Sequence, residues 1–370
     1  MGVLEHYRLR IEALSPIYIG SGEKLGKKEY IYLPWDQLVI VPDIHRIYAD
    51  IQKKGKGQDF LNYMLNNRRD SLGNWLKQAG YKKKDYNLWK RYELFAGDAF
   101  LTATAKEASA KEICCFMKDP YGLPYVPGSS IKGMIRTALL AWEVRHDHSN
   151  YTEIIKAIKT NATRGRRNTL ANETTQLEQK AFHTIERPDV KQSNAVCCNL
   201  SGLIIGDSDP IPVEQLVLTQ KVDYTLDGNE KPLPILRETL CPGTKIYFDL
   251  TIDTQVCPYS ITDILDALEE FQRLCYDSFY KRFRRGSKES GIVWLGGGAG
   301  FLSKTVLYPI LGEEAYQTVD QVLKETLGKN YEKHKHYKNR SLKIAPHVCK
   351  CAKYRGELYD MGMGRIEVLT

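Results

Sequence analysis

Residues 126–140 read VPGSSIKGMIRTALL and join a turn to an amphipathic helix without a spare residue between them. Pro127 and Gly128 are expected to form the turn, and Ser129 or Ser130 is expected to cap the helix. Apolar residues then recur at helical spacing along one face. They are Ile131, Met134, Ile135, Ala138, Leu139 and Trp142. This stripe predicts a helix that covers a hydrophobic core.

A second face of the same helix carries two cations, Lys132 and Arg136, four residues apart. Gly133 lies between them and allows another molecule to approach the helix backbone closely. The start of a helix presents free N–H groups and the positive end of the helix dipole. With Ser129 and Ser130, the cations therefore predict a phosphate site. The alternative is an ordinary capped helix with two solvated charges.

A glycine-rich loop follows a β-like run over 292–295, and residues 296–305 read GGGAGFLSKT. Glycine permits positive φ and lets the backbone approach a ligand or another chain. We predict that the loop binds a ligand through its four glycines and one lysine, namely Gly296, Gly297, Gly298, Gly300 and Lys304. The pattern departs from a nucleotide-binding P-loop, because Ser303 stands where the second glycine of that motif belongs.

Further motifs along the chain resemble those of a known family. They are Ser15–Gly22, Asp207–Pro210 after a strand, Leu240–Thr244 and Met361–Gly364 before the last strand. Together with the helix start and the glycine-rich loop, they resemble the RAMP proteins of CRISPR systems. Within that family, their order and the length of the chain are similar to subunit five of the type III-A (Csm) effector complex.

This resemblance implies a non-catalytic subunit that binds the guide RNA (crRNA) in antiviral defence. Such a subunit caps the backbone filament at the 3′ end of the crRNA and supports crRNA maturation. The implied partners are the crRNA, the backbone RAMP subunits, the small subunits, the target RNA indirectly and a recruited host nuclease. The implied fold is ferredoxin-like (RRM-type), with glycine-rich loops at the RNA.

Composition predicts a cytoplasmic protein without a membrane span. Hydrophobic residues make up 42% of the 370, and no apolar run approaches 18 residues. The nine cysteines contain no C-x-x-C pair, so reduced, buried thiols are expected. We predict neither a cofactor nor a metal.

The net charge of +8 is concentrated in a few segments. Residues 328–343 carry six cations against one acid, interleaved with tyrosine and histidine. Cations neutralise phosphates and aromatic faces stack on unpaired bases, so this composition is typical of a single-stranded RNA path. Shorter basic clusters lie at 82–91, 164–167 and 281–285. Each cluster alone has the simpler interpretation of a solvated surface.

The order of expected elements predicts an α+β fold made of two tandem ferredoxin-like domains with helical insertions. We place the first domain at 1–195, with a helical insertion and a polar arm, and the second at 196–370, with the glycine-rich loop. Strands are expected at 8–13, 30–33, 38–41, 246–252 and 365–369. Helices are expected within 44–80, from 130, and at 261–283 and 313–327. The polar arm covers 149–193.

An enzymatic alternative remains open. A metal-independent RAMP endoribonuclease would need a histidine near a cation for acid–base cleavage of RNA. His45, beside Asp43 and Arg46, is the best placed, and His146 and His148 follow the long helix. No histidine adjoins the two predicted phosphate elements. A third possibility is a structural bridge that contacts only protein neighbours.

Two motifs raise the question of a metal. Asp207 and Asp209 form a D-x-D that could bind Mg²⁺, but Pro210 favours a turn. The pairs His334-x-His336 and Cys349-x-Cys351 offer four zinc ligands, although their spacing is shorter than tetrahedral sites prefer. Zinc there stays an open alternative.

Overall fold

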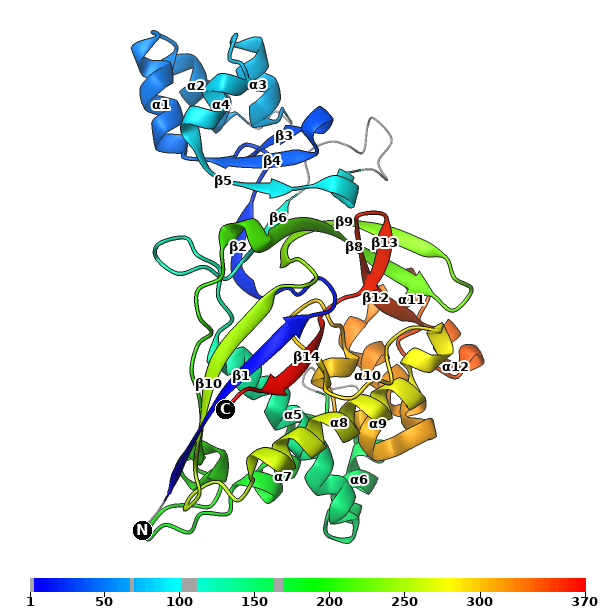
Figure 1. The fold of residues 1–370 in the computed structure, drawn as a ribbon. Coiled ribbons are helices and arrows are strands. Elements are labelled where there is room, and N and C mark those ends of the chain that lie inside the picture. The colour runs from blue at the N-terminus through cyan, green and yellow to red at the C-terminus, as the bar shows by residue number, and fades with distance from the viewer. Residues whose placement is uncertain (1–2, 67–69, 101–111, 163–168) are drawn as a thin grey trace.

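The structure, a computed structural model, describes residues 3–66, 70–100, 112–162 and 169–370. It is a mixed fold that contains two β-sheets and a set of α-helices (Figure 1). The predicted α+β class is therefore confirmed. Among the described helices, none combines the length and the hydropathy that a bilayer span requires.

The first sheet has five strands, and every pair of neighbours is antiparallel. Its central strand β1 alternates, with Leu9, Ile11 and Ala13 buried and the residues between them partly exposed. This alternation places one face of the sheet on the core. In spatial order the strands are β11 (Ile292–Trp294), β14 (Met363–Val368), β1 (Leu4–Ala13), β10 (Lys245–Asp253) and β7 (Leu203–Ile205).

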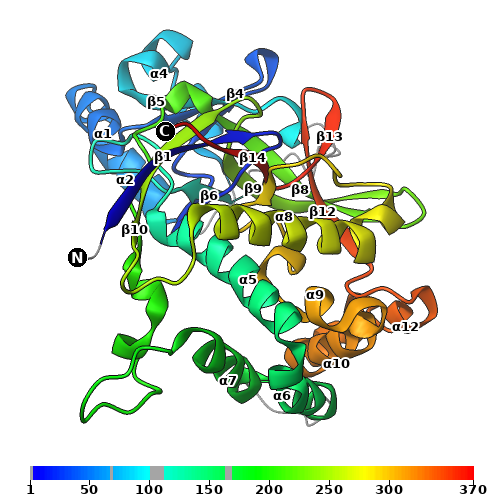
Figure 2. The same cartoon turned by 60° about the horizontal axis from the view of Figure 1, so that its bottom comes forward.

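Two long helices cover the core face of this sheet, as Figure 2 shows. The helix α5 (Gly128–His146) follows the predicted apolar stripe, and Ile131, Ile135 and Leu139 are completely buried. The helix α8 (Ile261–Ser278) starts with a capping box in which Ser260 and Asp263 bond to each other's backbone N–H. These helices place the start of α5 beside the glycine-rich loop.

The second sheet has nine strands, most of them antiparallel. Two short parallel pairs connect the central strands β8 and β9 to the rest of the sheet. β5 pairs with β8 on one side, and β6 pairs with β9 on the other. Seven strands follow the order β2 (Gly20–Leu25), β6 (Ile113–Phe116), β9 (Glu230–Leu240), β8 (Leu216–Thr225), β5 (Lys90–Phe95), β4 (Leu38–Pro42) and β3 (Ile31–Leu33). Off this path, β12 (Val348–Tyr354) pairs with β8 and with β13 (Glu357–Asp360).

The predicted helical insertion is confirmed and lies at one end of the molecule (Figure 1). It packs around its own core, in which Phe60, Leu76 and Trp89 are buried. Its helices are α1 (Ile44–Lys53), α2 (Gly57–Leu65), α3 (Leu72–Gln78) and α4 (Lys83–Trp89).

The remaining helices pack on α5 and α8 either directly or through one another. Two of them occupy the segment 149–193, for which the sequence predicted a polar arm with little periodicity. That expectation is wrong over the described part, because Tyr151, Ile155 and Leu177 are buried against the core. These helices are α6 (His148–Asn161), α7 (Ala171–Phe182), α9 (Leu307–Leu311), α10 (Ala315–Leu327), α11 (Lys329–Lys333) and α12 (Lys338–Leu342).

Both sheets combine strands from either side of the predicted domain boundary at 195/196. In the first sheet, β1 pairs with β10 and β14 from the second half. In the second sheet, β5 and β6 pair with β8 and β9. The boundary therefore does not separate two sheets, because the pairing partners of the early strands come from the end of the chain.

Candidate functional site

The two elements singled out in the sequence meet in one open cleft of about 520 Å³. The start of α5 forms one side, and the loop after β11 forms the other. Tyr18, Thr137, Trp294 and Ser303 also line the cleft. Six of the ten predicted site residues line it: Ser129, Ser130, Gly133, Gly296, Gly297 and Lys304.

The helix α5 begins earlier than predicted. Its N-cap is Pro127, whose side chain makes no capping bond, so Ser129 and Ser130 lie in the first turn instead of capping it. The cap comes from a distant segment, because Asp207 Oδ1 accepts a hydrogen bond from the Gly128 N–H at 2.8 Å. A Cβ at Gly128 would lie 2.2 Å from the Ile205 carbonyl oxygen. The D-x-D motif thus serves to anchor the helix start, and only glycine allows the approach.

Lys132 and Arg136 do not line the cleft, and both have protein partners. The Lys132 ammonium donates to the Leu200 and Leu203 carbonyl oxygens at 2.7 Å each. Burial lowers the pKa of Lys132. Arg136 pairs with Glu178 at 2.8 Å. Both cations therefore join α5 to the segments packed against it, and neither faces the cleft in which the sequence placed a phosphate.

The glycine-rich loop is held against Tyr18. The Gly297 N–H donates to the Tyr18 carbonyl oxygen at 2.8 Å. Gly296 has a φ of +87°, and a Cβ there would lie 2.3 Å from the same oxygen. A Cβ at Gly298 would lie 2.6 Å from Met361 Cε, and one at Gly300 would lie 3.0 Å from Lys350 Cγ. Close packing therefore explains three of the four glycines, and Gly298 and Gly300 lie outside the cleft.

The exposed groups of the cleft are small or cationic. Ser129, Gly133, Gly297 and Lys304 are all exposed. A Cβ at Gly133 would meet no atom within 4 Å, so the helix backbone is open to a ligand there. Lys304 makes no ion pair with any residue in the described ranges. This combination suits a polyanion, since it offers charge without a competing carboxylate.

An aromatic wall completes the cleft, and reasoning from the sequence missed it. Trp294 stacks on Tyr280 with ring centroids 4.4 Å apart. The guanidinium of Arg237 lies 4.9 Å from the centroid of the Tyr18 ring. Burial raises the pKa of Tyr18 to about 12, so the hydroxyl stays protonated at neutral pH. Tyr18 belongs to the motif Ser15–Gly22, and this motif was the feature of the sequence that could have identified Tyr18 as a cleft residue.

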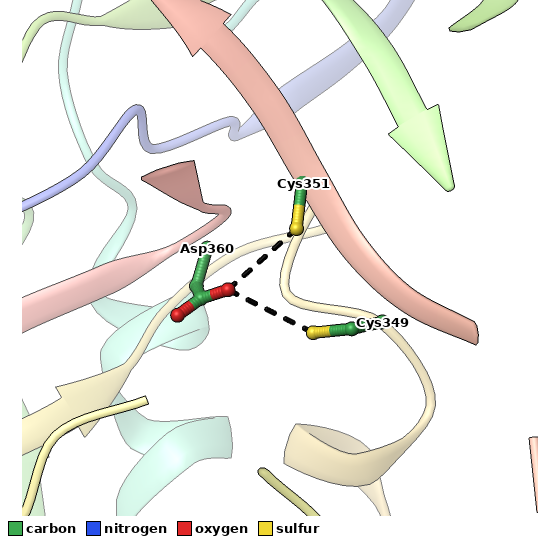
Figure 3. A group of neighbouring side chains, drawn as sticks. All are labelled: Cys349, Cys351 and Asp360. Atoms are coloured by element: carbon green, nitrogen blue, oxygen red, sulfur yellow. Dashed lines mark hydrogen bonds between the residues drawn. The ribbon is translucent and has the colours of Figure 1, made fainter. Parts of the chain in front are cut away.

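The four residues of the zinc alternative are not brought together. Cys349 and Cys351 instead donate to Asp360 Oδ1 at 3.8 and 3.6 Å (Figure 3). The same oxygen accepts from Arg285 Nε at 2.7 Å, and Oδ2 accepts from the Gly286 N–H. Within the described part of the chain, this trio is the one group close enough to hold a metal. The Asp360 carboxylate already forms an ion pair with Arg285, and this neighbouring guanidinium would repel a metal cation.

The histidines of the zinc hypothesis lie elsewhere. His336 faces His347, with ring centroids 5.1 Å apart, and His334 lies 6.3 Å from His336. Burial lowers the pKa of His347 to about 4. His347 is therefore neutral at physiological pH, and burial also lowers the pKa of His336.

The histidines proposed for cleavage also lie away from the cleft. His45 lines a separate pocket of about 280 Å³ with Asp43 and Arg91. His146 stacks on Trp142 at 3.9 Å and lies near Glu270. Among the residues that the structure describes, those lining the main cleft include neither a histidine nor a carboxylate.

Several predicted basic segments use their cations internally. Within 328–343, Arg340 pairs with the buried Asp320, which also accepts from Tyr331 and Asn339. Within 281–285, Arg282 donates to two backbone carbonyl oxygens of α12 and the residue after it. Within 82–91, Lys83 pairs with Asp36. The cluster at 164–167 lies outside the described residues.

Comparison with known proteins gives consistent matches. The family model of the RAMP superfamily matches residues 10–303. A Mycobacterium tuberculosis protein named CRISPR system Cms protein Csm5 is 29% identical, over 99% of this chain and 98% of its own length. A Streptococcus thermophilus protein of that name is 25% identical, over 81% and 80% of the two chains.

Two solved structures share the fold. One is a chain of a cryo-EM structure of a Csm–crRNA–target RNA ternary complex of a type III-A CRISPR–Cas system. It has a TM-score of 0.65 and 20% identity, and the match covers 99% of this chain and 100% of that one. The other is the crystal structure of T. onnurineus Csm5, with a TM-score of 0.62 and 19% identity over 96% and 99% of the chains.

Proposed function

This chain belongs to the RAMP superfamily, and on that premise we propose that it is a non-catalytic crRNA-binding subunit of a type III-A CRISPR effector complex. The observation that carries the proposal is the cleft itself. Elements more than 160 residues apart in the sequence present exposed backbone, hydroxyls and Lys304, which has no ion pair among the described residues, to the same space. The likeness to a chain of a Csm–crRNA–target RNA complex supports RNA as the ligand.

The chemistry of the lining favours binding over cleavage. Metal-independent cleavage of RNA needs a general acid and a general base within reach of the scissile phosphate. The cleft offers serine and threonine hydroxyls, one ammonium and the backbone, with Tyr18 kept neutral. These groups can bind a phosphate backbone. The described lining residues include no histidine or carboxylate that could act as the general acid or base.

The wider role follows from the relatives and is part of the proposal. The subunit caps the backbone filament at the 3′ end of the crRNA and supports crRNA maturation in antiviral defence. It contacts the backbone RAMP subunits and the small subunits, meets target RNA indirectly, admits a host nuclease and acts in the cytoplasm. We also infer that β1, α5, β7, β10, α8 and β14 form a ferredoxin-like unit, since their order along the chain is β-α-β-β-α-β, with other elements inserted between them.

A charge placed at Gly133 tests the cleft. We expect Gly133→Glu to weaken binding of single-stranded RNA at least tenfold, because the new carboxylate would face the phosphates. Gly133→Gln is the matched control, since it has the same size without the charge and should bind much more tightly than Gly133→Glu. Both changes remove a glycine from a helix interior, so neither should unfold the chain. Equal RNA affinity for the two variants in a fluorescence anisotropy titration would reject the cleft as the RNA site.

The second candidate is the metal-independent endoribonuclease. The observation in its favour is the separate pocket that is lined by His45, Asp43 and Arg91. This alternative requires that the isolated chain cleave repeat RNA in the presence of a chelator and lose that activity in His45→Ala. Under the binding proposal, the RNA stays intact in both samples.

A further inference from the structure

The second sheet carries a cluster of half-buried cations that is short of counter-charge. Arg237 on β9, Lys221 on β8 and Lys350 on β12 belong to three adjacent strands (Figure 1). The register pairs Thr219 with Arg237 and Ala352 with Lys221. Because side chains two residues apart on a strand share a face, Lys221 and Lys350 lie on the same face as Arg237.

One carboxylate, Asp223, serves this cluster. It bonds to Lys350 Nζ at 2.7 Å and also acts electrostatically on Lys221 and Arg237. Neither Lys221 nor Arg237 has an ion pair with a residue in the described part of the chain. The buried Arg237 Nε has no hydrogen-bond partner there either.

Cations in this position are costly without a ligand. Half-buried like charges repel one another, and burial penalises each charged form. Burial and the neighbouring charges of Lys350 and Arg237 lower the pKa of Lys221, and burial lowers the pKa of Arg237. A folded chain rarely keeps such a group without a partner. Among the described residues, none supplies the carboxylate that would pair with Lys221 or Arg237, and an external anion fits that position.

The cluster is continuous with the cleft. Arg237 lies over the ring of Tyr18, which lines the cleft, and its Nη1 contacts Met361 Sδ at 3.6 Å. Met361 packs on Gly298, and Lys350 packs on Gly300. The glycine-rich loop therefore lies between the cleft and the three cations. A strand of RNA that leaves the cleft past Tyr18 meets the cluster next.

We propose that Arg237, Lys221 and Lys350 form a second phosphate-binding site, which holds the backbone of the same single-stranded RNA beyond the cleft. The ligand class is a phosphodiester chain, since adjacent phosphates match a row of cations on adjacent strands. The guanidinium can bind one phosphate in a bidentate manner while the two ammonium groups neutralise the next. This inference rests on the proposed RNA-binding function and extends it to a new surface.

The test exploits opposite effects on stability and on binding. In the full chain, Lys221→Met removes a repelled charge, so the apo protein should melt higher by about 2 °C. The same change should weaken binding of a fluorescent oligouridylate by about fivefold at 0.1 M salt, because one counterion-release contribution with a log–log slope of about 0.7 is lost. Lys245→Met on β10 is the control, since Lys245 is an exposed lysine of the other sheet.

The outcomes separate this inference from the proposed function. A higher melting temperature with weaker RNA binding for Lys221→Met, and neither effect for Lys245→Met, supports the second site. Unchanged RNA affinity for Lys221→Met and for Lys221→Gln overturns it, whatever happens to stability. If Gly133→Glu still weakens RNA binding at least tenfold in that case, the cleft survives and the cation cluster alone is rejected. If Gly133→Glu also binds normally, both proposals fail.

Discussion

Lys132 and Lys304 carry the same charge and use it in different ways. The ammonium of Lys132 donates to two backbone carbonyl oxygens, that of Leu200 in the turn before β7 and that of Leu203 at the start of β7. Lys304, at the end of the 3-10 turn Leu302–Lys304, is exposed in the cleft. Charge pattern alone cannot distinguish the two, because the partners of Lys132 are carbonyls about 70 residues away. Long-range contacts, which composition does not reveal, decide which of the two lysines faces the cleft.

At the residue scale, Lys132→Met should therefore act on stability. We expect a loss of about 1–2 kcal/mol, because two carbonyl oxygens lose a charged donor. The salt dependence of RNA binding by the folded variant should match that of the parent, since Lys132 lies outside the cleft. Lys304→Ala should show the reverse, with parental stability and a flatter salt dependence. Urea unfolding and RNA titrations between 50 and 300 mM salt measure both. A flattened salt dependence in Lys132→Met would return this lysine to the binding site.

The helix α5 illustrates what an amphipathic pattern predicts and what it misses. The apolar stripe correctly predicts which face is buried, since Ile131 and Ile135 are inaccessible to solvent. The start of the helix was misplaced because its cap, Asp207, comes from a distant segment. Local capping rules assume that the donor groups are satisfied nearby. The glycine-rich loop follows a strand, as the sequence predicted. Most of its glycines, however, allow close packing against Tyr18, Met361 and Lys350, which no local motif encodes.

At the element scale, two glycines of α5 should respond in opposite ways to the same substitution. A Cβ at Gly128 would collide with the Ile205 carbonyl oxygen, so Gly128→Ala should cost several kcal/mol or prevent folding. Gly133→Ala should stabilise the chain by about 0.5–1 kcal/mol, because the site is open and alanine favours the helix. Thermal unfolding of the two variants beside the parent makes the comparison. Equal stability would mean that Asp207 and β7 do not fix the start of the helix.

The whole molecule is built around a strand from its first residues. β1 pairs with β10 from Leu4 to Glu12 and with β14 from Leu9 to Ala13. Sequence periodicity predicts β1 and β10 as strands, but not that they are neighbours, because pairing depends on closing a loop of more than 200 residues. For this reason local pattern predicted elements such as β1, β10, α5 and α8, whereas strands such as β2, β5 and β6 were missed and the division into 1–195 and 196–370 does not follow the sheets.

At the scale of the whole chain, this topology makes a prediction about fragments. Expressed alone, residues 1–195 lack the partners of β1, and residues 196–370 leave the facing edges of β10 and β14 unpaired, which favours aggregation. We expect neither fragment to unfold cooperatively by itself. Co-expression should restore a soluble complex with a single thermal transition, because all pairings of β1 can then form between the fragments. Circular dichroism melts of each fragment, of the pair and of the intact chain test this. A cooperative transition in residues 196–370 alone would show that β1 is dispensable, and the two halves would then be independent domains.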